Sequence, residues 1–473
     1  METGKHGDVD IRIEPAVLVG VHLPGDDVDP ADPLGELRAL AETAGVRVVA
    51  TLEQNREAPR GKTYLGKGKV EELAALCKEQ EARVVIFDNE LAPSQVAELE
   101  KLLSLKVIDR SELILDIFAN RATTRQAQLQ VEIAQLEYTA PRLRAMWAHL
   151  GQVTGGAPVG VGTRGPGEQQ IEIDRRIVKA KLDKLRRELH EIEARRNREV
   201  MQRRTDHFTA ALVGYTNAGK SSIFNRLTTG GAYAADKLFA TLGTRVEAWN
   251  VGGGNTVLLS DTVGFVRKLP HNLVASFRAT LQDAVSSHVL LIVVDVADRN
   301  APRQLEVVRS VLDEIGAQGQ PRLLLLNQVD RLAQTWQRLD GPDNRLNEWL
   351  AREPDALPVS AKTGEGMDAL NQRVLGLMRG DSRACVLSVP LQDGRTVDFI
   401  EKRVPVKERN WTDTHVQLSV EIGRRQLEQL LAGGARMLVD GLPPHEALAT
   451  IWPPVPSTAP ARARPHDTYA VGE

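Results

Sequence analysis

The octapeptide GYTNAGKS at residues 214–221 constrains the fold of this 473-residue chain more than any other feature. An apolar run at 210–213 precedes it, and a helix-like run at 222–227 follows it. A Walker A loop requires this context, because backbone N–H groups then surround a phosphate at the N-terminus of a helix. The pattern therefore predicts a phosphate-binding loop on a doubly wound, mainly parallel sheet, which places the chain in the α/β class.

The residue types in this loop suggest separate roles. Lys220 is expected to neutralise the β- and γ-phosphates, and the Ser221 hydroxyl is expected to ligate Mg²⁺. The other candidate phosphate-site residues are Gly214, Asn217, Ala218, Gly219 and Ser222. The loop alone predicts a binding site for a nucleoside triphosphate and does not indicate which base is bound.

Further short motifs occur in a fixed order after apolar runs. Asp261 ends the run at 256–260 and could hold Mg²⁺ through water, while the N–H of Gly264, three residues later, could meet the γ-phosphate. The tetrapeptide NQVD at 327–330 follows the run at 323–326, and the tripeptide SAK at 360–362 follows 357–359. Each motif is expected at the carboxyl end of a strand, where doubly wound sheets bind ligands.

The last two motifs favour guanine. Asp330 could accept hydrogen bonds from the guanine N1–H and amino group, a donor pair that adenine lacks. The residues expected to contact the base are Asn327, Gln328, Asp330, Ser360, Ala361 and Lys362. The motifs together predict a site for GTP and GDP with Mg²⁺.

The segment expected to sense the γ-phosphate is LFATLGTR at 238–245. It offers Thr241 and Thr244 as the Mg²⁺-contacting threonine, and Thr241 is favoured. Phe265 follows Gly264 at a place where many GTPases have a water-orienting glutamine, so slow intrinsic hydrolysis with outside help is expected. In the alternative interpretation Phe265 only packs and another segment supplies a glutamine. Asn217 is either an inert turn residue or the mark of a K⁺-activated enzyme.

Composition limits the remaining possibilities. The chain has 60 Lys+Arg, 63 Asp+Glu and 42% hydrophobic residues, as expected of a soluble globular protein. Its two cysteines, Cys77 and Cys385, exclude a disulfide framework or a Cys-rich zinc site. No apolar run is long enough to span a bilayer, so we expect no membrane span. A cytoplasmic location is expected, and association with ribosomes or a membrane surface is left open. We also expect a monomer. No DNA partner is expected.

Five segments are predicted: an α/β domain at 1–120, a helical hairpin at 121–206, the nucleotide domain at 207–379, a small α+β domain at 380–452 and a disordered tail at 453–473. Helix-forming runs at 121–150 and 171–204 flank the Gly-rich stretch at 151–167, which favours an antiparallel hairpin with a loop at its tip. Residues 164–204 carry 13 Lys+Arg and 8 Asp+Glu. That excess fits a solvated coiled coil and a nucleic-acid-facing surface equally well.

Two local patterns complete the predictions. The tetrapeptide GKGK at 66–69 lacks Walker A spacing, so a turn into a helix is favoured over a second, ATP-binding phosphate loop. In the small domain, strands are expected at 385–391, 398–406 and 415–420, with a helix at 424–432.

Several of these segments resemble one family, the HflX GTPases, a branch of the translation-associated P-loop GTPases. They are YLGKGKVEE at 64–72, LQVEIAQL at 129–136, GTRGPGE at 162–168, LFATL at 238–242 and DTVGF at 261–265. The resemblance implies a GTP-hydrolysing enzyme that binds the large ribosomal subunit. It further implies that the hairpin reaches toward rRNA near the peptidyl-transferase centre, and that the enzyme splits stalled ribosomes, notably under heat stress.

The candidate rRNA contacts are Arg164, Arg175 and Arg176, on or beside the hairpin loop. The sequence departs from the family pattern at Gly243 and Thr244, where the family has Asp-Pro, and at Gln328, where lysine is usual. Two other functions remain open: a GTP-gated RNA-binding ribosome assembly factor, and a regulator of a protein partner whose hairpin is an ordinary coiled coil.

Overall fold

The computed structural model describes residues 14–26, 29–59, 61–153, 166–228, 238–239, 244–267, 283–335, 344–432 and 434–452. The chain divides into two compact units. The first comprises Met1–Asn250 and Thr256–Asn371, and the second Val251–Asn255 and Gln372–Glu473. In the described part of the chain, no helix is both long and apolar enough to cross a membrane.

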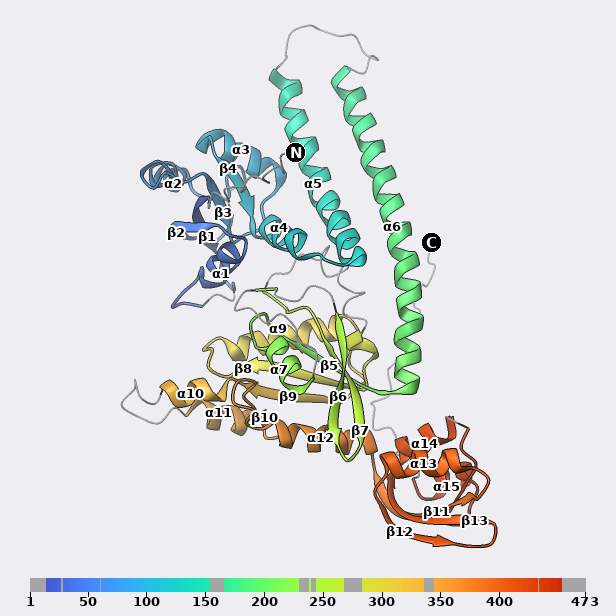
Figure 1. Ribbon diagram of the computed structural model, residues 1–473. Coiled ribbons are helices and arrows are strands. Elements are labelled where there is room, and N and C mark those ends of the chain that lie inside the picture. The colour runs from blue at the N-terminus through green and yellow to red at the C-terminus, as the bar shows by residue number, and fades with distance from the viewer. Residues whose placement is uncertain are drawn as a thin grey trace, which may run out of the picture. The chain divides into compact units, whose positions relative to one another are not determined.

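The first unit opens with a parallel four-stranded sheet in the order β2-β1-β3-β4. Its strands are β1 (Pro15–His22), β2 (Arg47–Asn55), β3 (Val84–Phe87) and β4 (Lys106–Asp109). Helices α1 (Gly35–Thr43), α2 (Lys67–Glu79), α3 (Pro93–Leu103) and α4 (Arg110–Arg121) join and follow them (Figure 1). The predicted α/β domain is confirmed, and the GKGK segment enters α2 as expected.

Helix α4 was not predicted, although its signals are present. The Asp109 carboxylate caps it by accepting a hydrogen bond from the Glu112 N–H. The apolar residues buried on it are Leu113, Ile114, Leu115, Ile117 and Phe118. Because these nearly adjacent residues are buried on several sides of the helix, they do not show the single apolar stripe of a surface helix.

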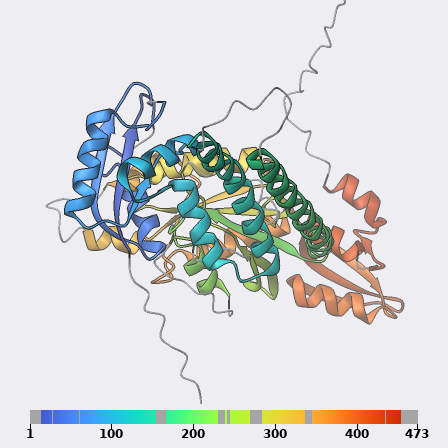
Figure 2. The same cartoon turned by 90° about the horizontal axis from the view of Figure 1, so that it is seen from above.

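Two long helices, α5 (Arg125–Val153) and α6 (Pro166–Asp206), lie side by side in both ribbon views (Figures 1 and 2). Leu129, Ile133 and Leu185 are buried between them. Ion pairs cross the interface from Glu132 to Lys181 and from Glu137 to Arg186, each at 2.7 Å. The predicted two-helix pairing is therefore present in the described residues.

The nucleotide domain contains a six-stranded sheet in the order β10-β9-β8-β5-β7-β6. Its strands are β5 (Phe208–Gly214), β6 (Arg245–Gly252), β7 (Asn255–Asp261), β8 (Val289–Asp295), β9 (Arg322–Asn327) and β10 (Leu357–Pro358). The helices are α7 (Lys220–Leu227), α9 (Ala301–Glu314), α10 (Val329–Thr335), α11 (Arg345–Arg352) and α12 (Met367–Arg379). Strand β5 pairs in parallel with β7 and β8, so the predicted doubly wound sheet is confirmed.

The second unit has an antiparallel sheet in the order β12-β13-β11-β14. Its strands are β11 (Ser382–Pro390), β12 (Val406–Trp411), β13 (His415–Gly423) and β14 (Leu438–Val439), with helices α13 (Gly394–Arg403), α14 (Arg424–Ala432) and α15 (Pro444–Thr450). The strand predicted at 398–406 is wrong, because most of it lies in α13. The Asp393 carboxylate caps that helix, and the buried Ile400 and Val404 follow a helical four-residue step.

Candidate nucleotide site

The loop between β5 and α7 requires glycine at two positions. A side chain on Gly214 would bring its Cβ to 2.3 Å from the Val293 carbonyl oxygen. Gly219 has φ of +90°, and a Cβ there would lie 2.2 Å from Asn327 Nδ2. These contacts let the loop pass close to two other strands, which explains the glycines in the sequence pattern.

Lys220, the first residue of α7, is buried beneath this loop. Its ammonium donates hydrogen bonds to the carbonyl oxygens of Gly214 at 3.1 Å and Tyr215 at 2.7 Å. Burial lowers its pKa to about 8, and the nearby negative charge of Asp261 opposes that shift. The loop's own carbonyls thus hold the cation in the place where phosphate charge is expected.

Ser221 and Asp261 lie together at the end of β7. The Ser221 hydroxyl donates to Asp261 Oδ2 at 2.7 Å, and Asp261 is completely buried. The neighbouring Thr262 hydroxyl donates to the Leu212 carbonyl at 2.7 Å, which ties this strand end to β5. A hydroxyl beside a carboxylate is a hard-oxygen donor set, so these residues fit Mg²⁺.

The segment after β7 is held against the phosphate loop. The Phe265 N–H donates to the Gly214 carbonyl at 3.1 Å, and the Thr216 N–H donates to the Phe265 carbonyl at 2.8 Å. A Cβ on Gly264 would lie 2.8 Å from Thr216 Cα and 2.9 Å from Lys220 Nζ, so only glycine fits. The Phe265 side chain is 3% exposed and belongs to the core.

The NQVD and SAK segments meet the loop from the other side. Asn327 Nδ2 donates to the Ala218 carbonyl at 2.9 Å, and Asn327 Oδ1 accepts from the Ala361 N–H at 3.2 Å. The Ser360 hydroxyl donates to Asp330 Oδ1 at 2.7 Å. One buried asparagine therefore joins the phosphate loop, 109 residues from its bonded partner there, to the SAK segment, 34 residues from its partner there.

The remaining predicted site residues are either exposed or lie partly or wholly outside the described part of the chain. Asn217, Ser222 and Lys362 are exposed around the loop. Thr241 and Arg164 lie outside the described residues, and Arg175 is described only as part of the α6 backbone. Arg176 is exposed on α6. The expected tail at 453–473 also falls outside the described part of the chain.

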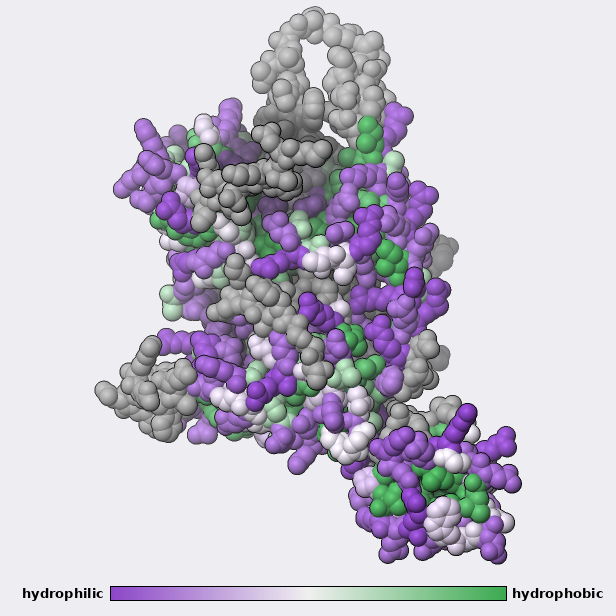
Figure 3. All heavy atoms as spheres, viewed as in Figure 1, coloured by the Kyte–Doolittle hydropathy of each residue, from purple (hydrophilic) through white to green (hydrophobic). Residues whose placement is uncertain are grey.

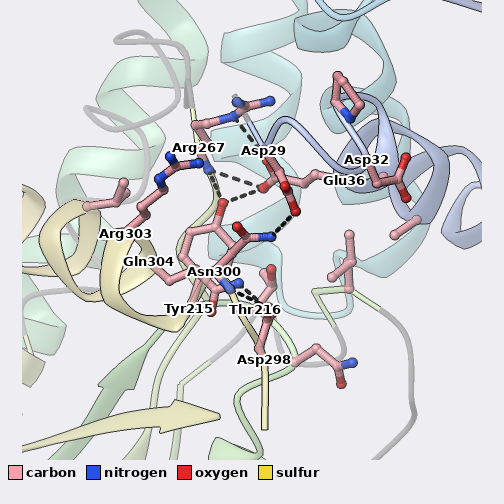
Figure 4. Close-up of a pocket in the computed structure, with 16 residues that line it drawn as sticks. Asp29, Asp32, Glu36, Tyr215, Thr216, Arg267, Asp298, Asn300, Arg303 and Gln304 are labelled. Carbon is pink, nitrogen blue, oxygen red and sulfur yellow. Dashed lines mark hydrogen bonds and ion pairs between the residues drawn. The ribbon is translucent and has the colours of Figure 1, made fainter. Parts of the chain in front are cut away.

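A polar cluster beside the loop was not foreseen. The Tyr215 hydroxyl donates to the Glu36 carboxylate of α1 and accepts from the Arg267 N–H at 2.7 Å (Figure 4). Arg110, which is 2% exposed, pairs with Glu36 at 2.9 Å and with Asp88 at 2.7 Å. No sequence pattern indicates this cluster, because its members are far apart along the chain.

The charges of the cluster are balanced inside the protein. Burial raises the pKa of Glu36, but the positive charge of Arg110, the Tyr215 hydrogen bond and Arg267 outweigh it, so the pKa is lowered overall. Burial raises the pKa of Tyr215 well above its usual value, and the charge of Glu36 adds to that effect. Glu36 is therefore ionised and Tyr215 neutral near neutral pH.

A cavity of about 310 Å³ lies beside this cluster, against Thr216 and Asn217 of the loop (Figure 4). Asn300, just before α9, closes part of it by donating from Nδ2 to Asp29 Oδ2 at 2.8 Å. The phosphate loop and residues of the N-terminal sheet domain thus line the same cavity.

The parallel sheet, the glycine loop and the motifs at its strand ends define a P-loop GTPase, a GTP hydrolase. Family models match the chain under the descriptions "GTP-binding GTPase N-terminal" at 31–119, "GTP-binding GTPase Middle Region" at 121–203 and "50S ribosome-binding GTPase" at 209–328. GTPase HflX of Escherichia coli (strain K12) is 39% identical over 410 residues, covering 86% of this chain and 93% of the relative. The chain belongs to the HflX family of GTPases.

A second HflX protein shows similar identity. GTPase HflX of Magnetococcus marinus is 42% identical over 402 residues, covering 84% of this chain and 89% of that protein. Among solved structures, the chain is similar to SsGBP in complex with GDP, at 25% identity with a TM-score of 0.43, covering 77% of this chain and 98% of that one.

Proposed function

We propose that GTP and GDP bind at this loop with Mg²⁺. In this proposal Lys220 contacts the β- and γ-phosphates, Ser221 and Asp261 hold Mg²⁺ directly or through water, and Gly264 meets the γ-phosphate. Thr241 is the proposed switch threonine. Asn327 and Asp330 choose guanine, with Ser360, Ala361 and Lys362 behind the base. The packing of three motifs around Asn327 supports this assignment.

The proposed partner is the large ribosomal subunit, and the proposed role is to split or rescue stalled ribosomes in the cytoplasm, as a monomer that does not use DNA. The observation that carries this is the α5–α6 hairpin, whose second helix ends at Asp206, two residues before β5 leads into the phosphate loop. Arg176, Lys179 and Lys184 are exposed along α6. Figure 3 shows hydrophilic residues over much of the described part of this helix.

A long helix with exposed cations can approach RNA phosphates without reading sequence. Because α6 ends two residues before β5, the proposal also has ribosome contact on this helix affect the phosphate loop. The description "50S ribosome-binding GTPase" for the family model at 209–328 supports the same partner.

Hydrolysis without a partner is proposed to be slow. Phe265 is buried and has no group that could orient water, so the stimulus is expected to come from the ribosome. K⁺ bound near Asn217 is a second proposed source of positive charge. Equal turnover in potassium and sodium buffers would remove that part of the proposal.

The decisive experiment measures GTP hydrolysis by the purified protein with and without large ribosomal subunits, using ATP as the control nucleotide. Strong stimulation by the subunit, for GTP only, would support the proposal. No stimulation of a protein that still binds GTP would move the partner elsewhere. Sedimentation then separates splitting from assembly, because dissociation of intact ribosomes supports splitting and association with precursors alone contradicts it.

The proposed RNA contacts have their own test. Replacing Arg164, Arg175 and Arg176 together by Glu should weaken cosedimentation with the large subunit and leave GTP binding intact. Unchanged ribosome binding would rule out these three contacts.

A further inference from the structure

The guanine motif of this chain has a neutral Gln328 in the place where lysine is usual. Gln328 adopts φ of +68°, a left-handed conformation that is uncommon for a residue with a side chain. Its Nε2 lies 3.5 Å from the Asn217 carbonyl oxygen, at the outer limit of a hydrogen bond. The side chain therefore reaches the phosphate loop without carrying a charge there.

Arg331, in the first turn of α10, controls how this carboxamide is oriented. Its Nη1 donates to Gln328 Oε1 at 2.6 Å. An arginine only donates and a backbone carbonyl only accepts. A single orientation of the amide satisfies both neighbours, with Oε1 toward Arg331 and Nε2 toward Asn217.

Arg331 is itself anchored at the end of β8. The same Nη1 lies 3.0 Å from Asp295 Oδ2, and the Arg331 N–H donates to the Gln328 carbonyl at 2.9 Å. The guanidinium therefore places a positive charge within hydrogen-bond distance of Gln328. The Asp295 carboxylate is mostly buried and lies close to the Arg331 guanidinium. It therefore anchors the contact between Arg331 and Gln328 at the end of β8.

We propose that Arg331 is a positioning residue for the guanine nucleotide. It holds the Gln328 carboxamide against the phosphate loop, and the pair together replaces the lysine of the usual guanine motif. This inference rests on the nucleotide site proposed above, and it assigns to Arg331 a role that depends on the identity of residue 328.

The test is a double-mutant cycle on the full chain, with GDP affinity as the main readout. Arg331→Met and Gln328→Lys are made singly and together, and Arg322→Met is the matched control. Arg322 stands at the opposite end of β9 and pairs with Asp313 at 2.7 Å, so it is also an arginine in an ion pair with an aspartate. Each variant is compared for GDP Kd, for GTP KM and kcat, and for its melting temperature without nucleotide.

In the natural background, Arg331→Met should raise the GDP Kd by about 3- to 10-fold, the effect that losing one ordinary hydrogen bond usually has. The loss should appear in Kd and KM more than in turnover at saturating GTP. In the Gln328→Lys background the same substitution should change Kd by less than about 2-fold, because lysine supplies the charge itself. Arg322→Met should leave the GDP Kd unchanged.

Two results would overturn the inference. Equal losses in both backgrounds would mean that Arg331 acts through Asp295 and not through Gln328. A GDP Kd for Arg331→Met equal to that of Arg322→Met would mean that Arg331 does not position the nucleotide. Failure of the unsubstituted chain to bind GDP is distinguishable from both, since it would remove the proposed nucleotide site together with this inference.

Discussion

At the scale of single residues, the buried ammonium of Lys220 should make nucleotide binding depend on pH. Its pKa is lowered to about 8, chiefly by burial, and bound phosphates should raise it again. Below that pH the lysine is charged with and without nucleotide, so the affinity is constant. Above it, binding requires proton uptake, and the GDP Kd should rise by up to about 10-fold per pH unit.

Calorimetry of GDP binding in buffers of different ionisation enthalpy checks this at pH 7 and at pH 8.8. Proton uptake should be near zero at the lower pH and a substantial fraction of one proton at the higher. The Lys220→Met variant, which lacks the ammonium and leaves the titration of the base in place, is the control. A Kd that stays flat with no uptake would contradict the lowered pKa.

Gly219 gives a second prediction at this scale. A Cβ at this position would displace Asn327, whose Nδ2 also donates to the Ala218 carbonyl, so Gly219→Ala disturbs the loop and the guanine motif together. We expect the GDP Kd to rise by at least about 10-fold.

The matched control is Gly376→Ala in α12, where a Cβ would meet nothing within 4 Å. That variant should bind GDP normally and gain about 0.5–1 kcal/mol in stability, because alanine favours a helix over glycine. Urea denaturation and equilibrium GDP binding measure both. Equal affinities for the two variants would show that the close approach at Gly219 is unimportant.

The site residues that could be predicted from the sequence lie in local motifs, and those that could not are joined by long-range contacts. Lys220, Ser221 and Asp261 belong to short motifs that follow apolar runs, so the local sequence was sufficient to place them at strand ends. Tyr215 and Glu36 are bonded across 179 residues, and nothing in either local sequence requires the other. Contacts between segments that are distant in sequence depend on tertiary packing, which residue spacing does not encode.

At the scale of elements, the hairpin of α5 and α6 depends on a small core. Leu185 is 6% exposed between Leu129 and Ile133, whereas Ile177 on the same helix is 61% exposed. Leu185→Ala should destabilise the paired helices by about 2–4 kcal/mol, because it leaves a cavity in a buried contact. Ile177→Ala should change the stability by less than about 0.5 kcal/mol.

Hydrogen exchange of amides in α5 and α6 measures this difference while the nucleotide domain acts as an internal reference. Faster exchange in both helices for Leu185→Ala, and in neither for Ile177→Ala, is expected. Equal protection in the two variants would indicate that the helices do not depend on this contact.

Elements were predicted well where one periodicity dominates. The apolar run of β5 and the helix-forming run of α6 predict these elements correctly, whereas 398–406 predicts a strand where the structure has mostly helix. That segment mixes β-branched Ile400 and Val404 with charged residues, a composition that suggests a strand, whereas the Asp393 cap of α13 lies before it. Capping and a four-residue apolar step were the better guides, because intrinsic strand propensity is weak outside a sheet context.

At the scale of the whole molecule, the second unit has a hydrophobic cluster of its own. The second unit is built around Leu387, Ile400 and Leu418, and the described residues proposed for the nucleotide all lie in the first. A unit with its own core can fold by itself. The nucleotide site is therefore expected to survive removal of the C-terminal residues.

A chain ending at Arg379 should bind GDP with a Kd within about 2-fold of the full chain, because sites in separate cores are energetically independent. This end point keeps α12 complete, including the buried Leu370 and Val374. Equilibrium binding and the melting temperature with and without GDP are the measurements. Loss of GDP binding by a truncated chain that still melts cooperatively would show that the second unit supports the nucleotide site, since a failure of folding would abolish the melting transition as well.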